Sequence, residues 1–435
     1  MNQACNSGPI DTASSSSDSS PRPYYLTVNA GSSSIKFAGY ALADQSEHLQ
    51  LLFQGQIDDR GGGEQVSLSV SRNGEQHTRM LSAEAGGLSL EPVLNWLNSQ
   101  GLVSALQGIG HRVVHGGEAF QQPVLIDVNV LDAIAACNRF APLHNPANLG
   151  GIRACQTAFP GIPQVAVFDT AFHQTLSEAH FLYAVPYQWY QEHGVRRYGF
   201  HGTSHQYVAQ QAETRLGLAQ GTGRFVSLHL GNGCSAAAIE AGQCVDTSMG
   251  LTPLEGLMMG TRSGDLDPGL HEYLCQQLQC DISELTRQLN KASGLLGVSG
   301  LTSDMRQIQQ AMDAGHEGAT RAFAMFCLRA AKAVAAMRVS LTALDAVIFT
   351  GGIGEHSSAV RARVLSHLHW LTPPLCSQAN QDHGSHTAGI ITARGEVPSS
   401  VHALVVPTDE EIMIAHHVHT LLAKEQPLAE GVFHE

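Results

Sequence analysis

The sequence contains no uninterrupted run of about 18 apolar residues, the length that a membrane-spanning helix requires. Its first 23 residues also lack the basic start and apolar middle of a secretory signal peptide. They are instead rich in serine and end in Pro21-Arg22-Pro23, which predicts a disordered tail that the protein does not need for its function. We therefore expect a cytoplasmic protein whose ordered part begins near Tyr24.

Positive charge is scarce. The 24 Lys and Arg residues face 38 Asp and Glu residues, so the formal net charge is −14. Nucleic acid and anionic membrane surfaces are poor partners for such a chain. An anionic substrate would need a local cluster of Arg, Lys and His.

Cysteine is present but without a pattern. The nine cysteines are an odd number, and they are scattered without metal-ligand spacing. Cys275 and Cys280 have four residues between them, but no second pair accompanies them. Reduced thiols of a cytosolic protein are the expected state.

The chain is long enough for two domains, because 435 residues exceed one ordinary core. Hydrophobic residues make up 43% and charged residues 14%, a globular composition. Apolar alternation and helical stripes predict two successive α/β cycles. The first cycle comprises strands within 24–81, helix 90–100, strand 109–115, helices 128–138 and 148–159, and strand 164–169. The second comprises strands 225–230 and 234–240, helices 268–279, 282–291, 303–314 and 319–340, strands 346–350 and 401–406, and a closing helix 409–422. This repetition predicts a duplicated α/β fold with a ligand cleft between its halves.

The octapeptide Asn29–Lys36 (NAGSSSIK) stands between two predicted strands. A tight turn of this composition exposes backbone N–H groups, hydroxyls and one ammonium, which suit a phosphate or a hydrated metal ion. It is not a P-loop, since that motif places Gly-Lys-Ser/Thr at the start of a helix. Ser-rich turns are equally typical of solvated hairpins, so the octapeptide alone does not decide its role.

Four glycine-rich turns are predicted at strand ends: 31–34, 231–233, 294–300 and 351–354. Together they favour a nucleotide held by backbone amides, although 294–300 by itself is as typical of a flexible loop. Five further segments pack His, Arg or Asp beside Gly or Pro: 111–117, 141–146, 168–173, 198–205 and 259–268. A lone histidine is usually structural, but glycine permits close backbone approach and makes functional roles more plausible here.

With these segments in order, the chain resembles the acetate kinases. The resemblance extends from about Tyr24 to Ala423 and rests on the motifs NAGSSSIK, HRVVHGG, FDTAFH, YGFHGTSH, HLGNG and GTRSGD. It implies the duplicated βββαβαβα fold shared with sugar kinases, Hsp70 ATPases and actin. The implied division is a tail at 1–23, an acyl-side domain at 24–170 plus 408–425, and a nucleotide-binding domain at 171–407.

The resemblance also implies a reaction: ATP and acetate give ADP and acetyl phosphate, reversibly. A carboxylate is already ionised at neutral pH, so positioning and positive charge matter more than a general base. By the same resemblance, Arg112 and Arg262 bind the anions, and His201 donates to the transferred phosphoryl group. Asp169 is the family's catalytic carboxylate, and we expect it to orient an arginine or a metal-bound water.

The remaining roles follow from the same motifs. Mg²⁺, or Mn²⁺ in its place, is expected near Asn29 and Glu410, largely through water. Lys36 and the segment His229, Leu230, Gly231, Asn232 and Gly233 would meet the ATP phosphates. Adenosine would contact Asp304, Met305, Arg306, Gly352, Ile353, Gly354, Glu355 and His356. The acetyl methyl would lie against Val114, Leu143, Phe200 and Pro253, and family members are homodimers.

Two positions depart from the family: Asp409 and His356 each replace a usual Asn. They put nucleotide preference and Mg²⁺ affinity in question, but not the reaction class. Propionate or butyrate kinase is the nearest alternative, and the bulky Val114 favours acetate. More distant alternatives are a sugar kinase, which needs an Asp base, and a non-catalytic nucleotide-binding protein of the actin or Hsp70 type.

Overall fold

The computed structural model describes residues 21–31, 34–43, 48–59, 65–82, 90–142, 144–393 and 401–425. Ser32 and Ser33 of the octapeptide, Leu143 and the predicted tail up to residue 20 lie outside these ranges. Among the described residues, no helix is long and apolar enough to cross a membrane.

An eight-stranded sheet forms the first half of the molecule, in the order β5-β4-β3-β2-β1-β6-β8-β7. Strands β1 to β5 form an antiparallel meander, as predicted, whereas β1, β6 and β8 are parallel. The bounds are β1 Tyr24–Ala30, β2 Ser34–Leu42, β3 Leu49–Asp59, β4 Gln65–Arg72, β5 Glu75–Ser82, β6 Leu106–Val113, β7 Val124–Leu125 and β8 Gln164–Phe168. Its helices are α1 Glu91–Ser99, α2 Val128–Ala136 and α3 Asn145–Ala158.

A five-stranded sheet forms the second half, in the order β11-β10-β9-β12-β13. The strands are β9 Arg224–Leu230, β10 Cys234–Glu240, β11 Gln243–Thr247, β12 Ala346–Thr350 and β13 His402–Val405. The helices before and after them are α4 Glu178–Phe181, α5 Tyr187–His193, α6 Gly202–Leu216, α7 Gly269–Leu278, α8 Ile282–Lys291, α9 Gly294–Ser299, α10 Met305–Asp313, α11 Glu317–Met337, α12 Gly351–His356, α13 Ser358–Ser366, α14 Ser377–Gln381 and α15 Glu410–Glu425.

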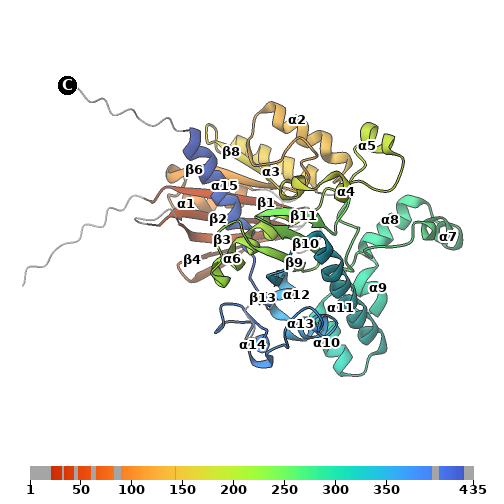
Figure 1. Ribbon diagram of the computed structural model, residues 1–435. Helices are drawn as coiled ribbons and strands as arrows, with labels where there is room; N and C mark the ends of the chain where they lie inside the picture. Colours follow the sequence, from red (N-terminus) through yellow and green to blue (C-terminus); the bar gives the residue numbers. More distant parts are fainter. Residues whose placement is uncertain are drawn as a thin grey trace, which may run out of the picture.

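The two sheets repeat one arrangement. In each, the first strand pairs antiparallel with the next strand across a glycine-containing turn, β1 with β2 and β9 with β10. In each, that first strand also pairs in parallel with a later strand, β6 or β12. The predicted duplicated α/β fold is therefore confirmed. Figure 1 shows the strands of the first sheet in red to yellow and those of the second in green to blue.

Alternating side chains place helices on both faces of each sheet. On β6, Gly108 and Gly110 face the closing helix α15, where a Cβ would lie 2.6 Å from Leu422 and 2.4 Å from Ile414. Ile109 points the other way, into the core that contains Cys155 of α3. The chain thus returns at its end to the first sheet, as Figure 1 shows for α15 in blue.

The second sheet follows the same rule. Val226 and Leu228 of β9 belong to the core under α11, whereas Phe225 packs with Val208 and Ala209 of α6. Polar side chains on the α6 face of this sheet, which include Ser227, consequently meet α6 and not solvent.

Sequence patterns located most elements to within a few residues, and several results differ. The glycine-rich turn predicted at 351–354 lies in helix α12, and helix α13 was not predicted. Residues 294–300 are not a turn at a strand end. They follow α8 and form helix α9, which begins at Gly294 in a left-handed conformation (φ 59°) and ends before Gly300. Helix α6 was not predicted, because its buried face is built from Gly, Thr, Ser, His and Ala and gives little apolar periodicity.

Candidate active site

Arg112 and Asp169 meet where two parallel strands of the first sheet end. The backbone N–H of Asp169 donates to Val113 O (3.0 Å), which continues the pairing of β6 with β8. Arg112 Nε and Nη2 donate to the two oxygens of Asp169 at 2.8 and 2.5 Å. Burial raises the pKa of the Asp169 carboxyl, and the Arg112 charge opposes that rise. The pair is a bidentate, buried unit of the kind that fixes a guanidinium plane.

Two side-chain oxygens, those of Asn29 and Glu410, lie next to the same guanidinium. Arg112 Nη1 donates to Asn29 Oδ1 (3.3 Å), and Arg112 Nε lies 3.7 Å from Glu410 Oε2. Asn29 sits at the end of β1, in register with the exposed Lys36 of β2. Both predicted metal-side residues therefore lie beside Arg112, although they are 381 positions apart in the chain.

Helix α6 is anchored on Asp169. Gly202 N donates to Asp169 O (3.0 Å), and a Cβ at Gly202 would lie 2.3 Å from that oxygen, so no other residue fits. The preceding His201 takes a left-handed conformation, φ 57°, which non-glycine residues rarely adopt. Such a strained position suggests a functional constraint on His201.

His201 lies against a second histidine, His229, at the end of β9. Their ring centroids are 4.3 Å apart and the rings are 24° from parallel. His201 Nδ1 contacts Ser235 Oγ (2.9 Å), and His229 Nδ1 contacts Ser204 Oγ (2.8 Å). Burial lowers the pKa of both imidazoles, to about 4 for His229. Nearby charges lower the pKa of His201 further, whereas at His229 the charge of Arg112 lowers it and those of Glu355 and Asp169 oppose that effect. Both rings are therefore neutral at physiological pH.

The turn between β9 and β10 brings in Arg262. A Cβ placed on Gly233 would lie 3.5 Å from His201 Nε2 and 3.5 Å from Arg262 Nη1, so both groups face this turn. Arg262 Nη1 also donates to Pro253 O (3.0 Å). Among the described residues, Arg262 has no carboxylate partner, and burial lowers the pKa of its guanidinium. A partly buried guanidinium without a carboxylate partner is suited to binding an anion.

His144 is a site residue that the sequence predictions did not include. Burial, followed by the charges of Arg262 and Arg112, lowers the pKa of this half-buried imidazole. His144 is therefore close enough to both arginines for their charges to act on its ring. Its loop, residues 141–146, was recognised as polar and proline-bracketed, but nothing in the loop itself indicates which partners it meets.

The predicted apolar wall is only partly described. Val114 and Phe200 are buried in one apolar cluster, at 7% and 1% exposure. Asn148 Oδ1 accepts from Val114 N (3.1 Å), and Asn148 Nδ2 donates to Ala30 O (2.7 Å), which ties Val114 to the end of β1. Pro253 reaches this site through its carbonyl contact with Arg262. Leu143 lies outside the described residues.

The two predicted adenosine segments are neighbours. Ser357, which follows α12, donates to Gln309 of α10 (3.0 Å). Glu355 Oε1 accepts from Gly351 N (3.0 Å) and Thr408 N (3.1 Å), so its carboxylate links the backbone at the start of α12 to the backbone before α15. Gly352 has open space where a side chain would be. The remaining members are a buried Met305, an Asp304–Arg306 ion pair at the start of α10, Gly354, which packs near Leu230 at the base of α12, Ile353, which packs against the apolar cluster under α11, and His356, whose ring centroid lies 6.1 Å from that of His383.

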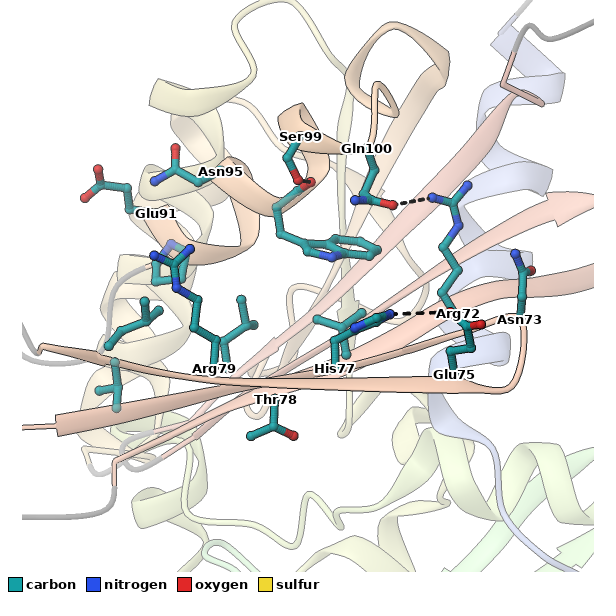
Figure 2. A pocket seen from close by; sticks show the side chains of 16 residues that line it. Arg72, Asn73, Glu75, His77, Thr78, Arg79, Glu91, Asn95, Ser99 and Gln100 are labelled. Carbon is teal, nitrogen blue, oxygen red and sulfur yellow. Dashed lines mark hydrogen bonds and ion pairs between the residues drawn. The ribbon is translucent and has the colours of Figure 1, made fainter.

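A hollow of about 870 Å³ lies elsewhere, between the β4–β5 hairpin and α1 (Figure 2). Arg72 Nη1 donates to Gln100 Oε1 (2.8 Å) at one end of it. Arg79, Glu91 and Asn95 also line it, as Figure 2 shows. None of the predicted site residues belongs to its lining.

The chain is similar to known proteins over most of its length. Residues 24–416 match the acetokinase family. An acetate kinase of Deinococcus radiodurans is 50% identical over 390 residues, which are 90% of this chain and 96% of that protein. A propionate kinase structure from Francisella tularensis subsp. tularensis superposes with a TM-score of 0.85 at 39% identity, covering 92% of this chain and 99% of the other. A Porphyromonas gingivalis acetate kinase structure gives 0.81 at 39% identity, covering 92% and 100%.

Proposed function

Because the chain belongs to the acetokinase family, and is accordingly a kinase, we propose that it transfers the γ-phosphoryl group of ATP to acetate, reversibly, to give acetyl phosphate and ADP. The observation that carries the proposal is the convergence of Arg112, Arg262 and two neutral imidazoles on one point beside Asp169. Two guanidiniums and two ring N–H groups suit a reaction in which one anion attacks another.

In the proposed reaction, an acetate oxygen forms a bond to the γ-phosphorus while the bond to the β,γ-bridging oxygen breaks, and ADP leaves. Arg112 and Arg262 hold acetate and the transferred group and offset their negative charge. His201 donates to an equatorial phosphoryl oxygen. Asp169 orients Arg112, because both of its oxygens already accept from that guanidinium.

Mg²⁺, with Mn²⁺ as a substitute, is part of the proposal. The oxygens of Asn29 and Glu410 beside Arg112 are hard donors of the type this ion prefers, so the residues fit. Within the described ranges, no group of three or more His, Cys, Asp and Glu could hold a metal ion, which suits an ion bound mainly by water and phosphate. When bound, the ion supplies neutralising charge for the phosphates.

The nucleotide would lie along the turn 229–233 and the neighbouring segments 304–306 and 352–356, with Lys36 at its phosphates. The exposed Gly352 supports this placement, because a base can approach its backbone without meeting a side chain. Glu355 and Met305 would act by holding their helices in position, since one fastens backbone and the other is buried.

We also propose that the two sheets mark two domains, 24–170 with 408–425 and 171–407, and that the protein is a cytoplasmic homodimer. The return of α15 to the first sheet supports the domain division. The eight cysteines in the described ranges are all free thiols, which fits a reducing compartment.

A propionate kinase is the second candidate function, and the good superposition with the Francisella tularensis propionate kinase favours it. One methylene changes binding in an apolar pocket by only about 1–3 kcal/mol, so both acids can be substrates. Val114, buried at 7% exposure, narrows the apolar wall and supports acetate as the better one.

A hydroxylamine trap tests the proposal directly. The purified protein is incubated with ATP, Mg²⁺ and acetate, propionate or butyrate, and acyl hydroxamate is measured beside ADP. We expect hydroxamate with acetate, less with propionate, and none after chelation of the metal. ADP formation without hydroxamate, or a sugar phosphate when hexoses are supplied, would contradict acyl phosphate synthesis. ATP formation from acetyl phosphate and ADP tests the reverse direction.

A further inference from the structure

Two buried chains of hydrogen bonds end on the stacked rings of His201 and His229. The first runs from Ser227 Oγ to His205 Nδ1 (3.0 Å), from His205 Nε2 to Ser235 Oγ (2.8 Å), and from Ser235 Oγ to His201 Nδ1 (2.9 Å). Ser227, His205 and Ser235 are all completely buried. β9, β10 and α6 each supply one of these three residues.

The hydroxyl protons set the direction of this chain. Ser235 has one proton, so it donates to one ring and accepts from the other. If Ser235 donated to His205, then His205 would donate to Ser227, and the proton of Ser227 would need another acceptor. Among the described residues, Ser227 Oγ has no second hydrogen-bond partner. The reverse order satisfies every group, because Ser227 donates to His205, His205 to Ser235, and Ser235 to His201 Nδ1.

The second chain gives the same result for His229. Thr408 Oγ1 donates to Ser204 Oγ (2.8 Å), so Ser204 gives its own proton to His229 Nδ1 (2.8 Å). Thr408 lies just before α15, the helix that packs on the first sheet. Both imidazoles therefore accept at Nδ1.

A neutral imidazole that accepts at one nitrogen carries its proton on the other. The Nε2–H groups of His201 and His229 are consequently both donors. They face the same turn: a Cβ on Gly233 would lie 3.5 Å from His201 Nε2, and a Cβ on Gly231 would lie 3.7 Å from His229 Nε2. The opposite tautomer would direct two lone pairs at any anion bound here.

We propose that Ser235 and Ser204 are positioning residues that fix the tautomers of His201 and His229, so that both rings present Nε2–H donors to phosphate oxygens at the Gly231–Gly233 turn. The identity of the anion, a nucleoside triphosphate, rests on the proposed function. The tautomers do not, because the hydrogen bonds that set them lie within the protein. A proton on Nδ1 in place of Nε2 would remove a donor without altering the net charge.

The tautomers can be read without any activity. In ¹⁵N-histidine-labelled full-length protein, long-range ¹H–¹⁵N spectra show which ring nitrogen carries the proton, and His201→Asn and His229→Asn assign the two rings. We expect both rings to be neutral and protonated at Nε2 near neutral pH. Protonation at Nδ1, or a charged ring, would overturn the proposal even if the protein makes acetyl phosphate. Failure to make acetyl phosphate would leave the proposal about the rings standing.

Variants connect the tautomer to turnover. Ser235→Ala should give a mixture of His201 tautomers and lower kcat about ten-fold, with little change in KM for ATP, because the donor acts in the transition state. Ser227→Ala removes the proton source one step earlier and should give a smaller effect in the same direction. Ser248→Ala is the matched control. Ser248 Oγ accepts from Ala236 N, next to Ser235, but does not belong to the chain of hydrogen bonds that ends on His201.

The control should keep the wild-type spectrum and kcat. A pure Nε2–H tautomer in folded Ser235→Ala, or equal losses in all three variants, would overturn the role of Ser235. If Ser235→Ala does not fold, Ser227→Ala and the wild-type spectrum decide the question, since each makes its own prediction about His201.

Discussion

Both carboxylate oxygens of Asp169 accept hydrogen bonds from the Arg112 guanidinium, at 2.8 and 2.5 Å. The carboxylate is almost fully buried, with 1% of its side chain exposed. Its backbone oxygen also accepts from Gly202 at the start of α6. Asp169 therefore joins Arg112 to the start of the helix that follows His201, and both of its carboxylate oxygens are engaged by the guanidinium. This arrangement supports an orienting role over that of a general base.

Asp169→Asn is expected to lower kcat about 100-fold, because the amide can accept only one of the two guanidinium bonds and Arg112 loses its fixed plane. Acyl hydroxamate formation measures the change. Asp345→Asn is the control, since Asp345 makes a similar bidentate pair with Arg224 (2.8 and 3.0 Å) away from the site. It should lower thermal stability but not turnover. Equal kcat losses in the two variants would refute a special role for Asp169.

Arg262→Ala should abolish most acyl phosphate formation and leave the protein folded, because its guanidinium has no carboxylate partner that would be left unpaired. Loss of one charged donor to a transition state is expected to reduce kcat by about 100-fold or more. Arg262→Lys should restore little, since an ammonium cannot bind an anion bidentately. Arg338→Ala is the control, because Arg338 likewise donates to a backbone carbonyl, that of Leu341. Near-normal turnover of Arg262→Ala would contradict the proposed role.

Val114→Ala should move the ratio of kcat/KM values towards propionate by about ten-fold, because the smaller side chain leaves room for one methylene. Steady-state kinetics with acetate and propionate measure the ratio. Val226→Ala makes the same change at a fully buried position of the same apolar cluster, and it should affect stability only. An acetate-to-propionate ratio that stays at the wild-type value in Val114→Ala would exclude Val114 from selectivity.

Stability should fall as the pH drops below about 6.5, the ordinary pKa of histidine. Burial lowers the pKa of several imidazoles in the folded protein, so as the pH falls the unfolded chain binds protons first and is stabilised relative to the folded state. Each such histidine reduces the free energy of unfolding by about 1.4 kcal/mol per pH unit until its own folded pKa is reached. Burial lowers the pKa to about 4 for five histidines: His111, His115, His173, His229 and His417.

Urea unfolding at about pH 7 and about pH 5 tests this dependence. The change in the free energy of unfolding per pH unit should depend little on salt concentration, because desolvation of the buried imidazoles causes it and not a screened surface charge. His111→Asn should remove the contribution of one histidine, whereas the exposed His369 offers a control in His369→Asn. Equal stability at the two pH values would show that the imidazoles are not held neutral.

The fold was largely readable from local patterns, and so were many of the site residues. Strand β10 and helix α8 have the predicted bounds, because a run of small apolar residues and a strong amphipathic stripe depend on neighbours in the chain. Helix α6 was missed, since its buried face consists of small and polar residues that only the surrounding sheet and helices make a core face. Helix α9 was predicted as a turn because its two glycines are typical of turns, whereas packing of its buried residues stabilises a helix.

The sequence alone determined which residues could act: the glycine turns, the arginines and histidines beside them, and the resemblance that their order carries. Only the tertiary structure decided how they act. It showed that Asp169 is committed to Arg112, that Arg262 lacks a carboxylate among the described residues, and that His144 joins the site. It also connected Ser235 and Ser204 to the two stacked rings. The physical reason is that hydrogen bonds, charge interactions and tautomers depend on distances between segments up to hundreds of residues apart, which no local pattern encodes.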